Sequence, residues 1–86
     1  MKKYNDKPRS AVITYSLIQE KSSYREIEWT YGIKAEMTEN GTITCRGCVS
    51  DVFLFRDEAE NFIDLLAENG VEPCHLAEVI YDLLSV

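Results

Sequence analysis

Apolar and polar side chains alternate almost without a break along residues 24–38, and Gly32 is the only gap in the polar series that begins at Glu26. The apolar or aromatic positions of this segment are Ile27, Trp29, Tyr31, Ile33, Ala35 and Met37. Successive side chains of a β-strand point to opposite faces, so the pattern predicts one long strand with an apolar face and a polar face. A half-buried strand of this kind is typical of an antiparallel sheet that is covered on one side only.

Two further segments complete a predicted three-stranded sheet. Residues 11–20 alternate in the same way, and residues 21–23 form a polar connection short enough for a hairpin. A third strand is expected over residues 42–50, after a turn at residues 39–41. The strand at residues 24–38 pairs with both neighbours, so it is central and the other two strands are edges.

The length of the turn at residues 39–41 sets the register of the third strand. A two-residue Asn-Gly loop would place Met37 opposite Thr44, whereas a three-residue loop places it opposite Ile43. The second register pairs apolar with apolar side chains, so we predict the three-residue loop. Gly47, farther along this strand, predicts a bulge or kink.

Two amphipathic helices follow the predicted strands. Asp57 reads as the N-cap of the first helix and Gly70 as its C-cap, and Pro73 opens the second helix. Between residues 51 and 57, the apolar run at residues 52–55 is a strand end, a fourth short strand or a buried connection. The predicted core positions are Trp29, Tyr31, Ile33 and Met37 of the sheet, with Phe62, Leu66, Leu76, Val79, Ile80 and Leu83 of the helices.

These elements predict an α+β fold in which a two-helix hairpin packs on one face of an antiparallel sheet. The sheet has three strands, or four if residues 52–55 pair, and the order is β-β-β-α-α. Residues 1–9 are expected to be a flexible basic tail with a net charge of +3, and residues 10–86 a single α+β domain.

Charge and composition exclude several classes of function. The 77 residues after the tail contain five basic and fourteen acidic side chains, a net charge of −9. Direct nucleic-acid binding needs cations, so it is not expected. No apolar run approaches ~18 residues, so we expect no membrane span. With no export signal, the three cysteines indicate reduced thiols in the cytoplasm.

Four residues are candidate metal ligands: Cys45, Cys48, Cys74 and His75. Cys45 and Cys48 form a C-x-x-C motif, but three residues along a strand span about 10 Å and point to opposite faces. Cys74 and His75 are neighbours on a predicted helix, where their side chains diverge. The pattern therefore favours structural cysteines, without a metal, a cofactor or a catalytic residue.

The main functional hypothesis is a non-catalytic protein-interaction domain. Its candidate surface comprises Glu26, Glu28 and Glu36 on the polar face of the central strand, with Thr14 and Ser16 on the first strand. The first strand carries no charge before Glu20, so it is an unprotected edge for self-association or for a partner protein.

Two alternative functions remain open at this point. The acidic body suggests an inhibitor of a nucleic-acid-handling protein, of the phage counter-defence type. The C-x-x-C motif suggests a zinc or thiol-redox site at Cys45 and Cys48.

Two short motifs carry a resemblance to a known family. Residues 30–33 read Thr-Tyr-Gly-Ile, and residues 72–76 read Glu-Pro-Cys-His-Leu, with a hairpin and an Asp-opened helix between them. This order resembles a domain-of-unknown-function family of clostridia and related Firmicutes that has a Tyr-Gly-Ile strand and a Pro-x-His-Leu helix start. The resemblance covers about residues 12–84. It implies a small bacterial or phage-borne cytoplasmic protein, and it carries over no active site.

Overall fold

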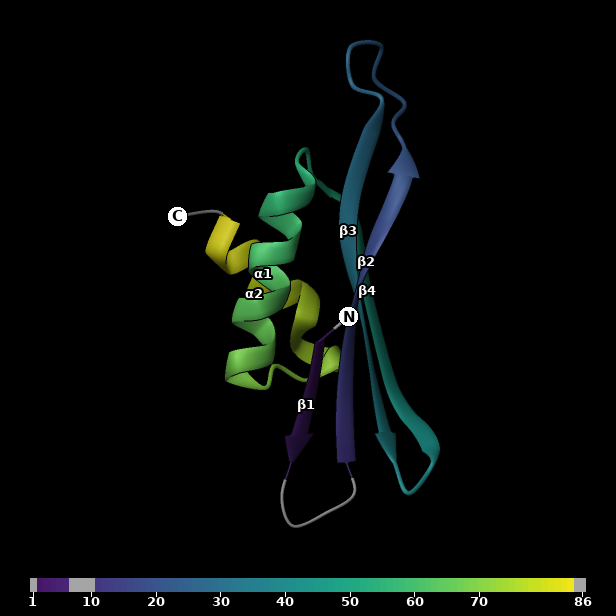
Figure 1. The fold of residues 1–86 in the computed structure, drawn as a ribbon, viewed down its shortest axis with the longest axis vertical. Coiled ribbons are helices and arrows are strands. Elements are labelled where there is room, and N and C mark those ends of the chain that lie inside the picture. The colour runs from purple at the N-terminus through teal and green to yellow at the C-terminus, as the bar shows by residue number, and fades with distance from the viewer. Residues whose placement is uncertain (1, 7–10, 85–86) are drawn as a thin grey trace.

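The structure is a computed structural model that describes residues 2–6 and 11–84. These residues form an antiparallel sheet in the order β1-β2-β3-β4, followed by two α-helices that lie on one side of the sheet (Figure 1). The elements are β1 (Lys2–Asp6), β2 (Ala11–Lys21), β3 (Trp29–Glu39), β4 (Thr42–Phe53), α1 (Arg56–Asn69), the 3-10 helix η1 (Pro73–His75) and α2 (Leu76–Leu84). The predicted α+β class and the succession of strands and then helices are confirmed.

The strand β1 was not predicted from the sequence. Residues 2–6 were expected to belong to a flexible tail, but they pair with β2 from Lys2↔Tyr15 to Asp6↔Ala11. Residues 1 and 7–9 of that expected tail lie outside the described part of the chain. An edge strand is held by backbone hydrogen bonds, so the polar sequence KKYND forms one without any apolar alternation.

The apolar run at residues 52–55 does not form a separate strand. Val52 and Phe53 end β4, and Leu54 and Phe55 connect it to α1. The edge of β2 is therefore covered by β1 over residues 11–15, and not by residues 52–55.

The turn between β3 and β4 differs from the predicted three-residue loop. Asn40 and Gly41 have φ angles of 52° and 82°, which give the two-residue turn that Asn-Gly favours. The register then shifts: Thr38 lies opposite Ile43, but Met37 lies opposite Cys45. The extra residue in β4 is a bulge, and it returns the odd-numbered residues of both strands to the same face.

The beginning of β3 also differs from the prediction. Residues 22–28 form the connection from β2, closed by a 2.9 Å hydrogen bond from the Ser22 amide to the Glu28 carbonyl. Trp29, predicted to face the core, is 39% exposed because this end of the sheet extends beyond the helices (Figure 1). A second register shift between β3 and β4 lies between Tyr31 and Ile33. The two backbones are close there, because a Cβ atom on Gly32 would lie 2.1 Å from the Val49 carbonyl oxygen.

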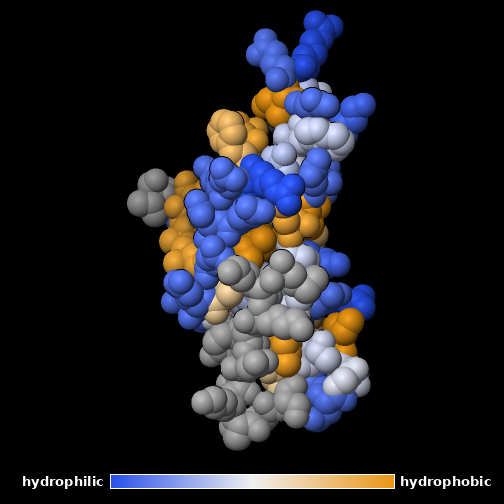
Figure 2. Space-filling model, viewed as in Figure 1, coloured by the Kyte–Doolittle hydropathy of each residue, from blue (hydrophilic) through white to orange (hydrophobic). Residues whose placement is uncertain are grey.

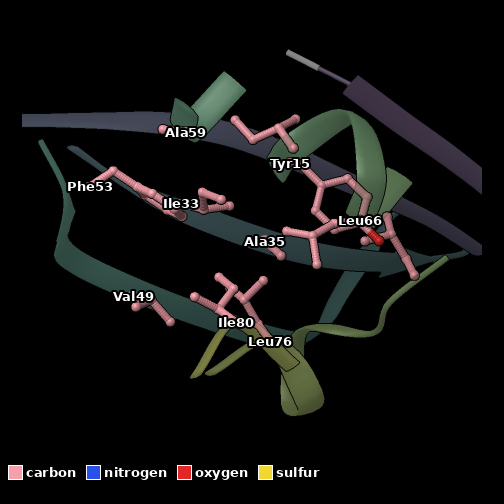
Figure 3. Close-up of a cluster of buried hydrophobic side chains, with 11 residues drawn as sticks. Tyr15, Ile33, Ala35, Val49, Phe53, Ala59, Leu66, Leu76 and Ile80 are labelled. Carbon is pink, nitrogen blue, oxygen red and sulfur yellow. The ribbon is translucent and has the colours of Figure 1, made fainter. Parts of the chain in front are cut away.

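The core lies between the sheet and the two helices (Figure 3). Its fully buried members include Tyr15 and Ile33 from the sheet and Leu66, Leu76 and Ile80 from the helical side. The Tyr15 hydroxyl donates a 2.5 Å hydrogen bond to the carbonyl oxygen of Val71. A buried tyrosine needs such a partner, and this one ties the segment after α1 to the centre of the sheet.

The two helices cover different parts of the sheet. The first, α1, packs on β1, β2 and β3, whereas α2 packs on β4 and η1. Most predicted helical core positions are buried or pack against the core, but Leu83 is 44% exposed. That prediction was wrong because the side chain lies toward the space between the helices and not over the sheet.

The ends of the helices follow the sequence signals only in part. The first turn of α1 begins at Arg56, so Asp57 is inside that turn and is not the N-cap. Gly70 is the predicted C-cap in the left-handed region at φ 59°, and Val71 N–H donates to the Leu66 carbonyl. Pro73 opens the second helical segment as predicted, although its first turn is 3-10.

Gly47 serves to dock η1 on the sheet, and it is not a bulge. It lies in regular register opposite Ala35, and a Cβ atom there would be 2.2 Å from the Pro73 carbonyl oxygen. The backbone of η1 therefore rests directly on β4 at this residue.

Candidate functional site

The two cysteines of the C-x-x-C motif lie on opposite faces of β4. Cys45 is opposite Met37 and half-buried on the side of the helices, whereas Cys48 is opposite Lys34 and exposed on the other side. The strand continues without a bulge between them. A shared metal or a disulfide between these two thiols is incompatible with this arrangement.

Three donor groups meet instead at η1. One ligand atom each of Glu72, Cys74 and His75 lies within 4.8 Å of the other two, and all three residues are exposed. The Cys74 thiol donates to Glu72 Oε2 at 3.8 Å. The expected divergence of Cys74 and His75 is therefore wrong, because the imidazole and carboxylate side chains are long enough to reach the thiol.

Glu72 was not among the ligands considered from the sequence. Its signal is the spacing Glu-x-Cys-His around Pro73, which places three donor types within four residues.

The environment of Cys74 disfavours its thiolate. Partial desolvation, then the neighbouring Cys45 thiol and the Glu72 carboxylate, raise the pKa of Cys74 above its usual value. A thiol held in its protonated form is a poor nucleophile, so this geometry does not support nucleophilic catalysis by Cys74.

The candidate interaction residues of the sheet are divided between two places. Thr14 and Ser16 lie opposite Glu36 and Lys34 on the face of the sheet away from the helices, where Arg46 Nε is 3.3 Å from Glu36 Oε2. Glu26 and Glu28 are exposed, but they belong to the connection at residues 22–28 and not to β3.

The predicted free edge of β2 is open only in its second half. Thr14 pairs with Lys3 on one side and with Glu36 on the other, so it is inside the ladder. In the described part of the chain, residues 16–21 pair with β3 alone.

An apolar groove lies between α1 and α2. It has a volume of about 330 Å³ and is lined by Leu65, Leu66, Asn69, Val71, Val79, Asp82 and Leu83. Leu65 and Leu83 are 41% and 44% exposed, so large aliphatic surfaces face water at its rim. Sequence periodicity did not predict this groove, because Leu65 and Leu83 continue the apolar stripes of the two helices that cover the core.

The segment that forms this groove is strongly acidic. Residues 56–84 contain one basic and eight acidic side chains, a net charge of −7, and all eight carboxylates are exposed. In residues 11–55, four basic and six acidic side chains give a net charge of only −2. Figure 2 shows hydrophilic side chains over the middle of the molecule, where α1 lies, with hydrophobic side chains beside them.

The fold and these surfaces define a small α+β domain with an acidic helical layer and an apolar groove. The chain belongs to a family of unknown function, DUF6514, which matches residues 1–86. Comparison with curated proteins and with solved structures finds no match. Among the described residues, no helix has the length and apolar character needed to cross a bilayer.

Proposed function

We propose that this protein is a non-catalytic interaction domain that binds an apolar, positively charged segment of a partner protein in the groove between α1 and α2. The observation that carries this proposal is that an exposed aliphatic groove lies within residues 56–84, a segment with a net charge of −7.

The lining of the groove supports binding over catalysis. Its volume of about 330 Å³ is at the lower end of small-molecule sites, but only Asn69 and Asp82 of its lining side chains are polar. An enzyme site needs several convergent polar groups that hold and activate a substrate. An aliphatic groove between two helices is suited to the apolar face of a third helical segment, with anchors at i, i+3 or i+4.

The charge distribution supports a basic occupant. Eight exposed carboxylates lie on the helical layer, and Arg56 is its only basic residue among residues 56–84. Complementary charges accelerate association and reject acidic competitors. The Debye length of about 8 Å at physiological ionic strength means that carboxylates at the rim act on a bound segment.

The same observation favours a second candidate, an acidic inhibitor of a nucleic-acid-handling protein. Carboxylates gathered on one layer, and not spread evenly, suit a surface that occupies the basic groove of such a protein. In either case the domain would act in the cytoplasm with reduced thiols, and its partner would be a protein and not nucleic acid itself.

A separate proposal is self-association through residues 16–21 of β2, the half of this strand that, among the described residues, pairs with β3 alone. This open half-edge would pair with the same segment of a second copy. Light scattering at high micromolar concentration would give a mass near twice the 9.9 kDa of the chain. Ser16→Lys should return the monomer, and a monomeric mass for the unaltered protein at this concentration rules out the dimer.

The groove is tested with two designed helical peptides of equal length that carry the same leucine positions. One peptide has lysines on its polar face and the other has glutamates, and fluorescence anisotropy measures binding of each. The lysine peptide should bind, and its affinity should fall by about tenfold or more between about 0.05 and 0.5 M salt. The glutamate peptide should not bind.

Two matched variants of α2 locate the site. Leu83→Ser should weaken binding of the lysine peptide by about tenfold to a hundredfold, because one buried leucine contact is lost. Tyr81→Ser removes another large exposed side chain of α2, which does not line the groove, so it should leave binding unchanged. Equal binding of both peptides, or equal effects of both variants, contradicts the proposal.

A further inference from the structure

We propose that Glu72, Cys74 and His75, together with Cys45 of β4, form a zinc-binding site at the junction of η1 and the sheet. This site is independent of the groove between α1 and α2, because none of its four residues lines that groove.

The spacing of the donor atoms is close to that of a zinc shell. Ligand atoms about 2.0–2.3 Å from a tetrahedral zinc ion are about 3.3–3.8 Å from one another. The donor atoms of Glu72, Cys74 and His75 all lie within 4.8 Å of one another. The donor atoms are thus at most about 1.0–1.5 Å farther apart than in a tetrahedral zinc shell, a difference that side-chain rotation can supply.

Cys45 supplies the fourth corner from a different element. Cys45 lies on the face of β4 that the helices cover, on the same side of the strand as Gly47, where η1 rests. The contact between Gly47 and the Pro73 carbonyl fixes η1 on β4 two residues from Cys45. The ligands are thus held by a strand and by a docked helical turn, which gives the site a rigid support.

The donor set selects zinc over the common hard cations. Two thiolates, one imidazole and one carboxylate match the ligands that zinc takes in structural sites. Magnesium and calcium prefer shells made of oxygen ligands, so thiol donors exclude them.

The surroundings of His75 fit a metal ligand. Its Nδ1 atom is 3.5 Å from Oε2 of Glu78, one turn farther along. A carboxylate partner on one ring nitrogen commonly orients the imidazole that binds a metal through the other. The bound ion would link η1, and with it the beginning of α2, to β4.

The test uses reduced, metal-free full-length protein and Co²⁺ as a spectroscopic substitute for zinc. Titration should give a thiolate-to-cobalt charge-transfer band and the intense visible bands of tetrahedral cobalt, with saturation at one equivalent. One equivalent of Zn²⁺ should then remove these bands, because zinc prefers a tetrahedral thiolate site.

Three serine variants assign the ligands. Cys45→Ser and Cys74→Ser should each abolish the charge-transfer band or reduce it by half or more. Cys48→Ser removes a thiol from the opposite face of β4, so it is the matched control and should leave the titration unchanged. Retention of the full band in Cys45→Ser or Cys74→Ser, or its loss in Cys48→Ser, overturns the site.

A second measurement on the unaltered chain keeps the test decisive if a variant fails to fold. One equivalent of Zn²⁺ should slow alkylation of Cys45 and Cys74 by about tenfold or more, with no change at Cys48, because metal-bound thiolates are blocked. Equal alkylation of all three thiols with and without zinc overturns the proposal.

Discussion

The sheet and the helical layer of this domain carry their charge in different ways. Residues 11–55, which contain β2 to β4, have a net charge of −2, and the open face of the sheet pairs Glu36 with Arg46 at 3.3 Å. Residues 56–84, which contain both helices, have a net charge of −7. The sheet therefore carries nearly balanced charge, whereas the helical layer carries a strong net negative charge that raises a negative potential at its surface.

The two layers also differ in how their apolar side chains are used. The sheet buries Ile33, Ala35 and Tyr15 completely. The helices bury Leu66 and Ile80 to the same extent, but they leave leucines exposed along the groove between them. The helical layer therefore covers the sheet with one part of its apolar surface and leaves another part exposed to water. Each of the following predictions tests one side of this comparison.

The largest expected effect is on the shared core. Ile80→Ala from α2 and Ile33→Ala from β3 should each lower the free energy of unfolding by about 2–5 kcal/mol, since both side chains are fully buried. Urea denaturation monitored by circular dichroism measures the change. Tyr81→Ala, at an exposed position of α2, should cost less than about 1 kcal/mol. If Ile80→Ala costs as little as this control, the helical layer does not share the core as described.

The next effect concerns the contact that joins the layers at η1. Gly47→Ala should lower the free energy of unfolding by about 1–3 kcal/mol, because its new Cβ atom would lie 2.2 Å from the Pro73 carbonyl oxygen. Ser50→Ala, at an exposed position on the same strand, is the control and should change stability by less than about 0.5 kcal/mol. Chemical denaturation compares the two, and equal stabilities would mean that η1 does not rest on β4.

A smaller effect is expected at the hydrogen bond between the layers. Tyr15→Phe removes the hydroxyl that donates to the Val71 carbonyl, and it should cost about 0.5–1.5 kcal/mol while keeping the ring in the core. Hydrogen exchange should show faster opening of the segment at residues 70–72 in this variant. An unchanged exchange rate there would show that the hydroxyl does not hold the end of α1.

The smallest effect is a pH dependence at Cys74. Its pKa is raised in the folded state, so at a given pH above neutrality the folded protein has less thiolate there than the unfolded chain. Alkylation of Cys74 in metal-free protein should therefore be slower in the native state than in urea at pH 8. The difference should narrow as the pH rises past the folded pKa, and mass spectrometry of the labelled peptides measures both rates. Equal rates at pH 8 contradict the raised pKa.

Much of the fold was accessible from the sequence because its signals are local. The period of two in residues 11–20 and 24–38 predicted β2 and β3, and the helical stripes predicted α1 and α2. Gly70 was predicted as a left-handed cap and Pro73 as a helix start, and both are found there. The register of β4 was predicted incorrectly. A two-residue turn followed by a bulge directs the side chains of β4 to the same faces of the sheet as a longer loop would, so the apolar pattern does not distinguish the two.

The candidate sites were much less accessible. Glu26 and Glu28 follow the strand alternation, but they fall in a connection that only the pairing of β2 with β3 defines. The four candidate ligands from the sequence were Cys45, Cys48, Cys74 and His75, but the structure puts Cys48 on the opposite face of β4 and brings Glu72, which was not considered, to Cys74 and His75.

Sequence periodicity was sufficient to predict β2, β4, most of β3 and both α-helices, with the apolar faces of these elements, because these properties repeat with a period that neighbouring residues reveal. It did not predict β1 or the connection at residues 22–28. The tertiary structure alone decided that β1 covers half of the edge of β2, that η1 rests on Gly47, and that the helices diverge enough to leave a groove. These features depend on backbone approach between segments distant in the sequence. Such contacts leave no periodic signature, because sheet register, the position of a bulge and the packing of each helix set them together.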